Sequence, residues 1–111
     1  MLHFMKLQPG PFEWIKSGKK TYELRLYDEK RRSISVGDII EFTNMENNEK
    51  LKTEVLGLQK FKNFEELYMN IPKTNLGYSE EEQALPSDME KYYPICEQEK
   101  YSVVAIEIKL I

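Results

Sequence analysis

Five segments of the chain carry the apolar residues expected of β-strands. In the second and the fifth, apolar and polar positions alternate with the period of a strand that buries one face. The polar run 44–50 separates the third segment from the fourth as a hairpin tip, and Gly57 predicts a bend or bulge within the fourth. The five segments are Leu2–Leu7, Thr21–Tyr27, Ile39–Thr43, Leu51–Phe61 and Val103–Leu110.

The alternation also assigns faces within two of these strands. In the second strand we assign one face to the core: Tyr22, Leu24 and Leu26. We assign its other face to solvent: Thr21, Glu23, Arg25 and Tyr27. In the last strand the inward positions are Val104, Ile106, Ile108 and Leu110.

The segments whose residues predict helices are short and lie between the predicted strands. Pro9–Pro11 predicts a turn, followed by a helix over Phe12–Ser17 that ends at Gly18, where a left-handed residue is favoured. The helix would bury Phe12 and Ile15, which lie three residues apart on one face, with Trp14 at its flank. Asp28–Arg32 predicts a densely charged loop.

The second half of the chain predicts further short helices. Asn63 has the residue type of an N-cap for a helix over Phe64–Asn70. Ser79 and Glu82 have the spacing of a capping box, which predicts a helix that a proline soon interrupts. Another short helix is predicted over Asp88–Tyr93. Five strands with a few short helices predict a small α+β domain around a curled sheet or barrel.

The composition of the chain argues against several classes of protein and several kinds of site. The 111 residues predict one domain, 1–111, and a net charge of −3 with a pI near 5.3 argues against a generally basic, histone-like nucleic-acid binder. One cysteine and one histidine leave no disulfide framework and no zinc site made of His and Cys within one chain, so we expect no metal and no cofactor. No apolar run is long enough for a membrane span, and residues 1–6 do not resemble a signal peptide. We therefore expect a soluble, cytoplasmic protein with no membrane partner.

Charge is distributed unevenly along the chain. Residues 19–32 hold six basic and three acidic residues, a balance of +3, whereas residues 63–100 hold three basic and nine acidic residues, a balance of −6. A local positive potential can persist on an acidic protein because salt screens charge over about 8–10 Å. The basic run is therefore either a solvated face of ion pairs, the commoner case, or part of a binding site.

The run Gly18–Arg25 matches the pattern G-x-K-x-x-E-x-R and resembles the signature of the ASCH domain, a relative of the PUA RNA-binding domain. Its fixed positions are Gly18, Lys20, Glu23 and Arg25. The flanking segments resemble the family as well, and the match extends over nearly the whole chain: Pro11–Gly18, Leu24–Arg32, Val36–Phe42 and Tyr101–Ile108. The resemblance implies an α+β, PUA-like fold, which is a small β-barrel with short helices at its openings.

The three charged residues of the motif have side chains suited to a polar ligand. Glu23 and Arg25 lie two residues apart and project from one face of a strand, and Lys20 lies at its entry. Arg25 can bind a phosphate or carboxylate with two hydrogen bonds, and Lys20 can supply a point charge. These residues predict a cleft for a nucleotide or an RNA. The alternative is that the same three residues form a structural ion-pair network that closes the barrel.

Three further residues are candidate ligand contacts. Arg31 and Arg32 would contact phosphates of an RNA, and their alternative role is solubility. Tyr27, on the face assigned to solvent, is a candidate for stacking on a base, as are Tyr92 and Tyr93. The resemblance implies RNA or nucleotide binding, in translation or RNA metabolism.

The resemblance also implies an enzymatic alternative. Some small members of the ASCH family are amidohydrolases that act on N4-acetylcytidine, and a lysine occupies the position of Lys20 in them. In those enzymes a hydroxyl residue occupies the position of Glu23, and a separate downstream glutamate completes the catalytic set. Here only Lys20 carries over, as the candidate catalytic residue if the protein is an enzyme.

Overall fold

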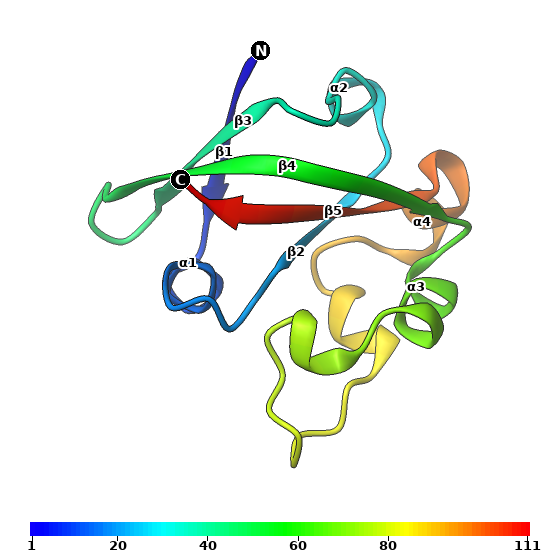
Figure 1. Ribbon diagram of the computed structural model, residues 1–111. Helices are drawn as coiled ribbons and strands as arrows, with labels where there is room; N and C mark the ends of the chain where they lie inside the picture. The colour runs from blue at the N-terminus through cyan, green and yellow to red at the C-terminus, as the bar shows by residue number, and fades with distance from the viewer.

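A curled five-stranded sheet forms the frame of the computed structural model, which describes all 111 residues (Figure 1). The strands lie in the order β1-β3-β4-β5-β2, with β1 parallel to β3 and the other neighbours antiparallel. Their bounds are Leu2–Leu7 (β1), Tyr22–Leu26 (β2), Ile39–Asn44 (β3), Lys50–Phe61 (β4) and Val103–Leu110 (β5). The structure confirms the five predicted strands and the α+β, PUA-like fold, with a sheet that forms part of a barrel.

Short helices lie at the two ends of the sheet. In Figure 1 the first helix lies below one end, and the third and fourth helices lie at the other, with an irregular yellow segment between. None of the helices is long and apolar enough to cross a membrane. The α-helices are α1 (Pro9–Lys16), α2 (Glu29–Arg32), α3 (Phe64–Asn70) and α4 (Ile95–Tyr101), and the 3-10 turns are η1 (Lys73–Asn75) and η2 (Pro86–Met89).

Helix α1 begins earlier than predicted. Pro9–Pro11 was expected as a turn, but it forms the first helical turn, and the Phe12 amide donates to the Gln8 carbonyl over 3.1 Å. Proline is favoured there because the first turn of a helix needs no N–H donor from it. Phe12 and Ile15 are buried as predicted, and Gly18 has the expected left-handed φ of +82°.

Residues 103–106 of β5 are buried on both faces of the sheet, because two separate cores flank them. Val104 and Ile106 belong to the core between the sheet and α1, here called the main core, whereas Val103 and Ala105 belong to a second core under α3. The alternation along β5 predicted that Leu110 lies inside, and this is wrong, since the last residue of the strand is 40% exposed.

Two predictions from short stretches of sequence, the N-cap of α3 and the bulge in β4, are confirmed, and one, the loop after β2, is not. The Asn63 side chain accepts from the Glu66 amide over 2.9 Å and begins α3. The register of β4 shifts between Val55 and Gly57, as the predicted bulge requires. The predicted loop after β2 is instead one turn of helix, α2, because the Asp28 side chain accepts from the Arg31 amide and caps it.

Helix predictions in the segment after α3 are largely wrong. Ser79 and Glu82 do make both hydrogen bonds of a capping box, 2.7 and 3.3 Å long, but no helix follows. The box closes an isolated turn because no stripe of apolar residues at helical spacing follows it. The helix expected over Asp88–Tyr93 is only the 3-10 turn η2, and α4 was not predicted.

Candidate functional site

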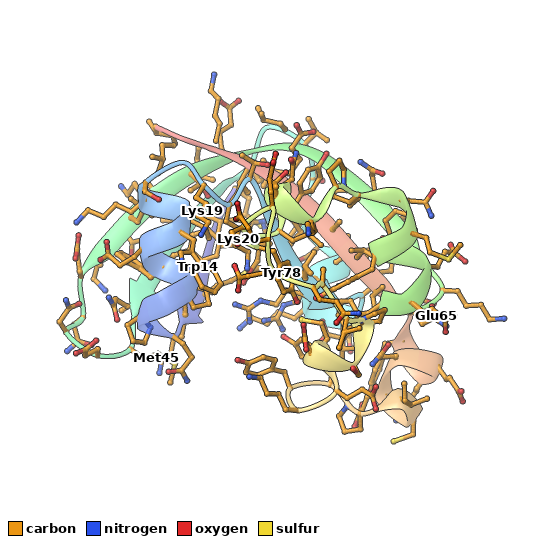
Figure 2. All side chains as sticks on the ribbon, turned by 90° about the horizontal axis from the view of Figure 1, so that it is seen from below. Trp14, Lys19, Lys20, Met45, Glu65 and Tyr78 are labelled. Atoms are coloured by element: carbon orange, nitrogen blue, oxygen red, sulfur yellow. The ribbon has the colours of Figure 1, made fainter.

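A cleft of about 400 Å³ lies between α1, the adjoining edges of the sheet and the segment 76–93. Its volume falls in the range of small-molecule sites. The charged side chains on its wall are Lys6, Lys20, Glu23, Glu82, Asp88 and Lys91, and the aromatic ones are Trp14, Tyr68, Tyr78, Tyr92 and Tyr93. Figure 2 shows Trp14 and Lys20 on one side of this region and Tyr78 on the other.

The wall formed by α1, β1 and β2, here called the sheet wall, contains the three charged residues of the motif. Lys20 Nζ lies 3.1 Å from Glu23 Oε1. Arg25 contacts the other oxygen, Glu23 Oε2, with Nη2 at 2.8 Å and Nε at 2.9 Å. Both carboxylate oxygens of Glu23 therefore have a cationic partner, and the three residues form one ion-pair network.

Sequence-local geometry places these side chains together. Gly18 ends α1, and the Lys20 amide donates to the Trp14 carbonyl over 2.9 Å, which fixes Lys20 at the start of β2. Glu23 and Arg25 then project from the same face of β2, because they lie two residues apart. The motif therefore predicted the grouping of the three side chains.

The burial of this face was not predicted. Glu23 was assigned to solvent but is only 3% exposed. It lies opposite Ile106 on β5, and Arg25 lies opposite Val104, so both project from the face of the sheet that holds the main core. The curl of the sheet also brings β1 close, and Arg25 Nη2 donates to the Lys6 carbonyl over 3.0 Å. Arg25 thus links the two edge strands, as the alternative of a barrel-closing network proposed.

The ion pairs decide the charge state of the buried carboxylate. Burial by itself raises the pKa of Glu23, but the neighbouring Lys20 and Arg25 charges outweigh it and hold the pKa below its ordinary value. Burial likewise disfavours the charged guanidinium, whereas the Glu23 carboxylate raises the pKa of Arg25 on balance. Two cations and one anion give the network a net charge of +1.

Lys20 is only 9% exposed, but it lines the cleft and has hydrogen-bonding capacity left over. Its ammonium group has three N–H donors, and Glu23 Oε1 is its one partner in the structure. Lys20 and Glu23 both line the cleft, whereas Arg25 lies behind them and is engaged with Lys6. The cleft therefore presents free donors from one fixed ammonium group.

The opposite wall, here called the loop wall, consists of residues 76–93 together with Tyr68 of α3. Tyr78 Oη donates to Asp88 Oδ2 over 2.8 Å, which leaves Tyr78 to accept from Tyr68 Oη at 3.0 Å. Burial first, and then the hydrogen bonds to Tyr68 and Asp88, raise the pKa of Tyr78 far above its ordinary value. Both phenols stay protonated at neutral pH and act as donors along this chain.

The two walls meet where Gly77 packs against Trp14. Gly77 has a φ of +105°, and a Cβ atom added there would lie 2.7 Å from Trp14 Cε3. Any side chain at position 77 would therefore collide with the indole, besides adopting a strained backbone. This contact fixes the width of one end of the cleft.

Three predicted contact residues lie outside the cleft. Tyr27 was expected to face solvent, but it packs partly against the main core, with Arg32 Cζ 5.1 Å and Lys60 Nζ 4.8 Å from its ring centroid. Arg31 Nη1 lies 3.4 Å from Asp28 Oδ2, and Arg32 Nε donates to the Tyr27 carbonyl over 3.1 Å. The part that Tyr27, Arg31 and Arg32 take in binding stays a prediction.

Sequence reasoning missed most of the loop wall. Tyr92 and Tyr93 were named as candidates, but Tyr68, Tyr78 and Asp88 were not. The one available signal was the concentration of tyrosines in the acidic segment 63–100. Spacing along that segment does not follow a helix or strand period, and so it could not show which of these side chains meet.

A family model described as the ASCH domain matches residues 5–111. The chain belongs to the ASCH domain family. Among solved structures, hypothetical protein PH0355 shares 37% sequence identity over the whole of both chains, with a TM-score of 0.85. Protein PF0455 from Pyrococcus furiosus shares 34% identity over 100% of this chain and 98% of that one, with a TM-score of 0.76.

More distant ASCH proteins share the fold alone. The ASCH domain from Lactobacillus crispatus is 14% identical over 97% of this chain and 79% of that one, with a TM-score of 0.69. No protein of curated function matches the chain. These distant structures support the fold, and the chemistry of the cleft depends on this chain's own residues.

Proposed function

We propose that this ASCH protein binds a nucleotide, free or at an unpaired position of an RNA, with the base inside the cleft. The observation that carries this proposal is the Lys20 ammonium group, which is fixed by Glu23 and has free N–H donors at a cleft lined by aromatic rings. A base has carbonyl or ring-nitrogen acceptors for these donors and a flat face for the rings. The general proposal of RNA binding for the ASCH family agrees with this assignment.

The charge distribution supports a base inside and a phosphate at the opening. At the cleft itself Glu23 pairs with the deep Lys20, and the second cation of the network, Arg25, does not line the cleft, so the interior suits a neutral polar group. Lys6 and Lys91 also line the cleft, are exposed and have no carboxylate partner. Such lysines attract phosphate groups and add affinity that does not depend on base sequence.

The amidohydrolase alternative gains no support from the geometry. The partner of Lys20 is the carboxylate of Glu23, and the family's amidohydrolases have a hydroxyl residue at the position of Glu23. The neighbouring Thr21 hydroxyl is buried, has no hydrogen-bond partner and does not line the cleft. We therefore retain binding as the function that the site supports best.

Trp14 provides a direct test, because it is the single tryptophan of the chain and lines the cleft. Titration with mononucleotides and with a short single-stranded RNA should change its fluorescence. Lys20→Ala should weaken binding about tenfold or more, as expected for a lost hydrogen bond to a charged group. Lys52→Ala, an exposed lysine on β4 outside the cleft, is the matched control.

Two results would overturn the proposal. One is the absence of binding to any mononucleotide or RNA, and the other is equal affinity of the Lys20→Ala and Lys52→Ala variants. Incubation with N4-acetylcytidine serves as a separate arm. Release of cytidine that depends on Lys20 would replace binding by the enzymatic alternative.

A further inference from the structure

Asp88 differs from the other carboxylates at the cleft because it is half-buried and keeps one oxygen without a partner. Both oxygens of Glu23 are engaged by cations, and Glu82, whose Oε2 also has no partner, is exposed at the surface. Asp88 has no cation within ion-pair distance, and both of its hydrogen bonds, from Tyr78 Oη and the Leu85 amide, go to Oδ2. Its Oδ1 atom therefore remains without a partner on the wall of the cleft.

The hydrogen bonds on Oδ2 also fix the orientation of this carboxylate. Tyr68 donates to Tyr78, and Tyr78 donates to Asp88, so two phenolic protons point along one chain toward the same group. The amide of Leu85, the residue before η2, donates to the same oxygen over 3.3 Å. A carboxylate held at one oxygen presents the other in a constant direction, which is the condition for selecting a ligand by hydrogen bonding.

We propose that Asp88 selects ligands whose base carries an exocyclic amino group, an inference that rests on nucleotide binding in the cleft. The amino N–H would donate to Asp88 Oδ1, while Lys20 on the opposite wall donates to a carbonyl or ring nitrogen of the same base. Tyr78 acts here as a positioning residue, since it orients Asp88 without contacting the base through its engaged hydroxyl.

The selection follows from the pairing of donors with acceptors. A base with a carbonyl in place of the amino group would bring an oxygen against the Asp88 carboxylate, and neither atom can donate. A site that hydrogen-bonds an amino group rejects the analogue without it, because the acceptor of the site is then left unpaired after losing its water.

Matched nucleotide pairs test this inference by Trp14 fluorescence. In the first pair, cytidine 5′-monophosphate carries an amino group where uridine 5′-monophosphate carries a carbonyl. In the second pair, guanosine 5′-monophosphate carries an amino group that inosine 5′-monophosphate lacks. The amino-bearing member of at least one pair should bind about tenfold more tightly or better. These measurements need only the unsubstituted protein.

Substitutions then assign the preference to Asp88. Asp88→Asn replaces the carboxylate by an amide that can donate or accept, and it should bring the ratio of affinities close to one. Tyr78→Phe should lower the ratio by a smaller factor, because Asp88 loses its orienting donor. Glu90→Gln removes a nearby exposed charge outside the cleft and should leave the ratio unchanged.

The outcomes separate this inference from the function on which it rests. Equal affinity within both pairs, tighter binding of the members that lack the amino group, or a preference that Asp88→Asn retains would overturn the role of Asp88 while nucleotide binding stands. A loss of all binding in Asp88→Asn with no change in its folded circular dichroism would also overturn it as a selecting residue. If none of the four nucleotides binds while the short single-stranded RNA does, this inference fails and nucleotide binding at an RNA stands. If the RNA does not bind either, both proposals fail.

Discussion

The two walls of the cleft are built by different physical means. The sheet wall consists of regular secondary structure, and its ion-pair network, Lys20, Glu23 and Arg25, lies within six residues of sequence. The loop wall has little regular structure and is held by the chain of hydrogen bonds from Tyr68 through Tyr78 to Asp88, across 20 residues. One wall stabilises an ionised carboxylate by two cations, and the other orients a carboxylate by neutral phenols.

This difference predicts that the two walls contribute unequally to the stability of the fold. Arg25 links β2 to the Lys6 carbonyl on β1, so the sheet wall contributes to closing the curled sheet as well as to the cleft. The loop wall meets the sheet wall through an isolated β-bridge between Leu76 and Lys20 but contributes no strand to the sheet, and its polar chain orients Asp88 at the cleft. We therefore expect substitutions in the sheet wall to affect folding most, and those in the loop wall to affect the shape and preference of the cleft.

The largest expected effect is that of Glu23→Gln. It leaves the Lys20 and Arg25 charges in a buried place without their anion, and the free energy of unfolding should fall by about 3–5 kcal/mol. Urea denaturation followed by circular dichroism measures the change. Glu46→Gln, in the exposed hairpin between β3 and β4, is the control and should change stability by less than about 0.5 kcal/mol. A loss below about 1 kcal/mol for Glu23→Gln would contradict a structural role of the network.

A smaller effect is expected at the contact between the walls. Gly77→Ala combines a left-handed backbone with a collision against Trp14 and should reduce stability by about 2–3 kcal/mol. Gly18→Ala shares the positive φ, but its Cβ would meet nothing within 4 Å, so its loss should be only about 1 kcal/mol. The same denaturation experiment compares the two variants.

Trp14 fluorescence separates the two causes. Gly77→Ala should shift the emission of the folded protein because the indole has to move, and Gly18→Ala should not. Equal losses of stability with unchanged spectra would mean that the loop wall moves away from α1 freely, and that Gly77 does not set the width of the cleft.

The smallest effect is a difference in pH dependence between the walls. Glu23 has a pKa below its ordinary value of 4.5 in the folded protein, so its contribution to stability is present above that pH and is lost as the pH falls through the folded value. Tyr78 has a raised pKa, so its contribution is present below its ordinary value of 10.0 and is lost as the pH rises through the folded value. The sheet wall should therefore weaken in acid and the loop wall in alkali.

Denaturation at several pH values tests this assignment with one variant for each wall. Glu23→Gln should flatten the acid side of the stability profile, by at most about 1.4 kcal/mol per pH unit. Asp38, whose pKa is lowered first by its hydrogen bond to His3, supplies an acid dependence that this variant leaves in place. Tyr78→Phe should flatten only the alkaline side. A change on the opposite side in either variant would contradict the comparison.

The sequence predicted the sheet wall well because its signals are local. Gly18 requires a turn between α1 and β2, and positions 23 and 25 share a face of any strand. It did not predict that this face is buried, because burial of Glu23 depends on β5 and on the approach of β1 from far along the chain. It also placed Tyr27 in solvent, since alternation along one strand cannot show that Lys60 and Arg32 cover its ring.

The sequence by itself determined the five strands, the turn at Gly18 and the grouping of Lys20, Glu23 and Arg25, because strand period and turn chemistry act over a few residues. Only the tertiary structure decided that the network is buried and that Asp88 lines a cleft. Those properties come from contacts between residues far apart in the chain, where no period relates the partners.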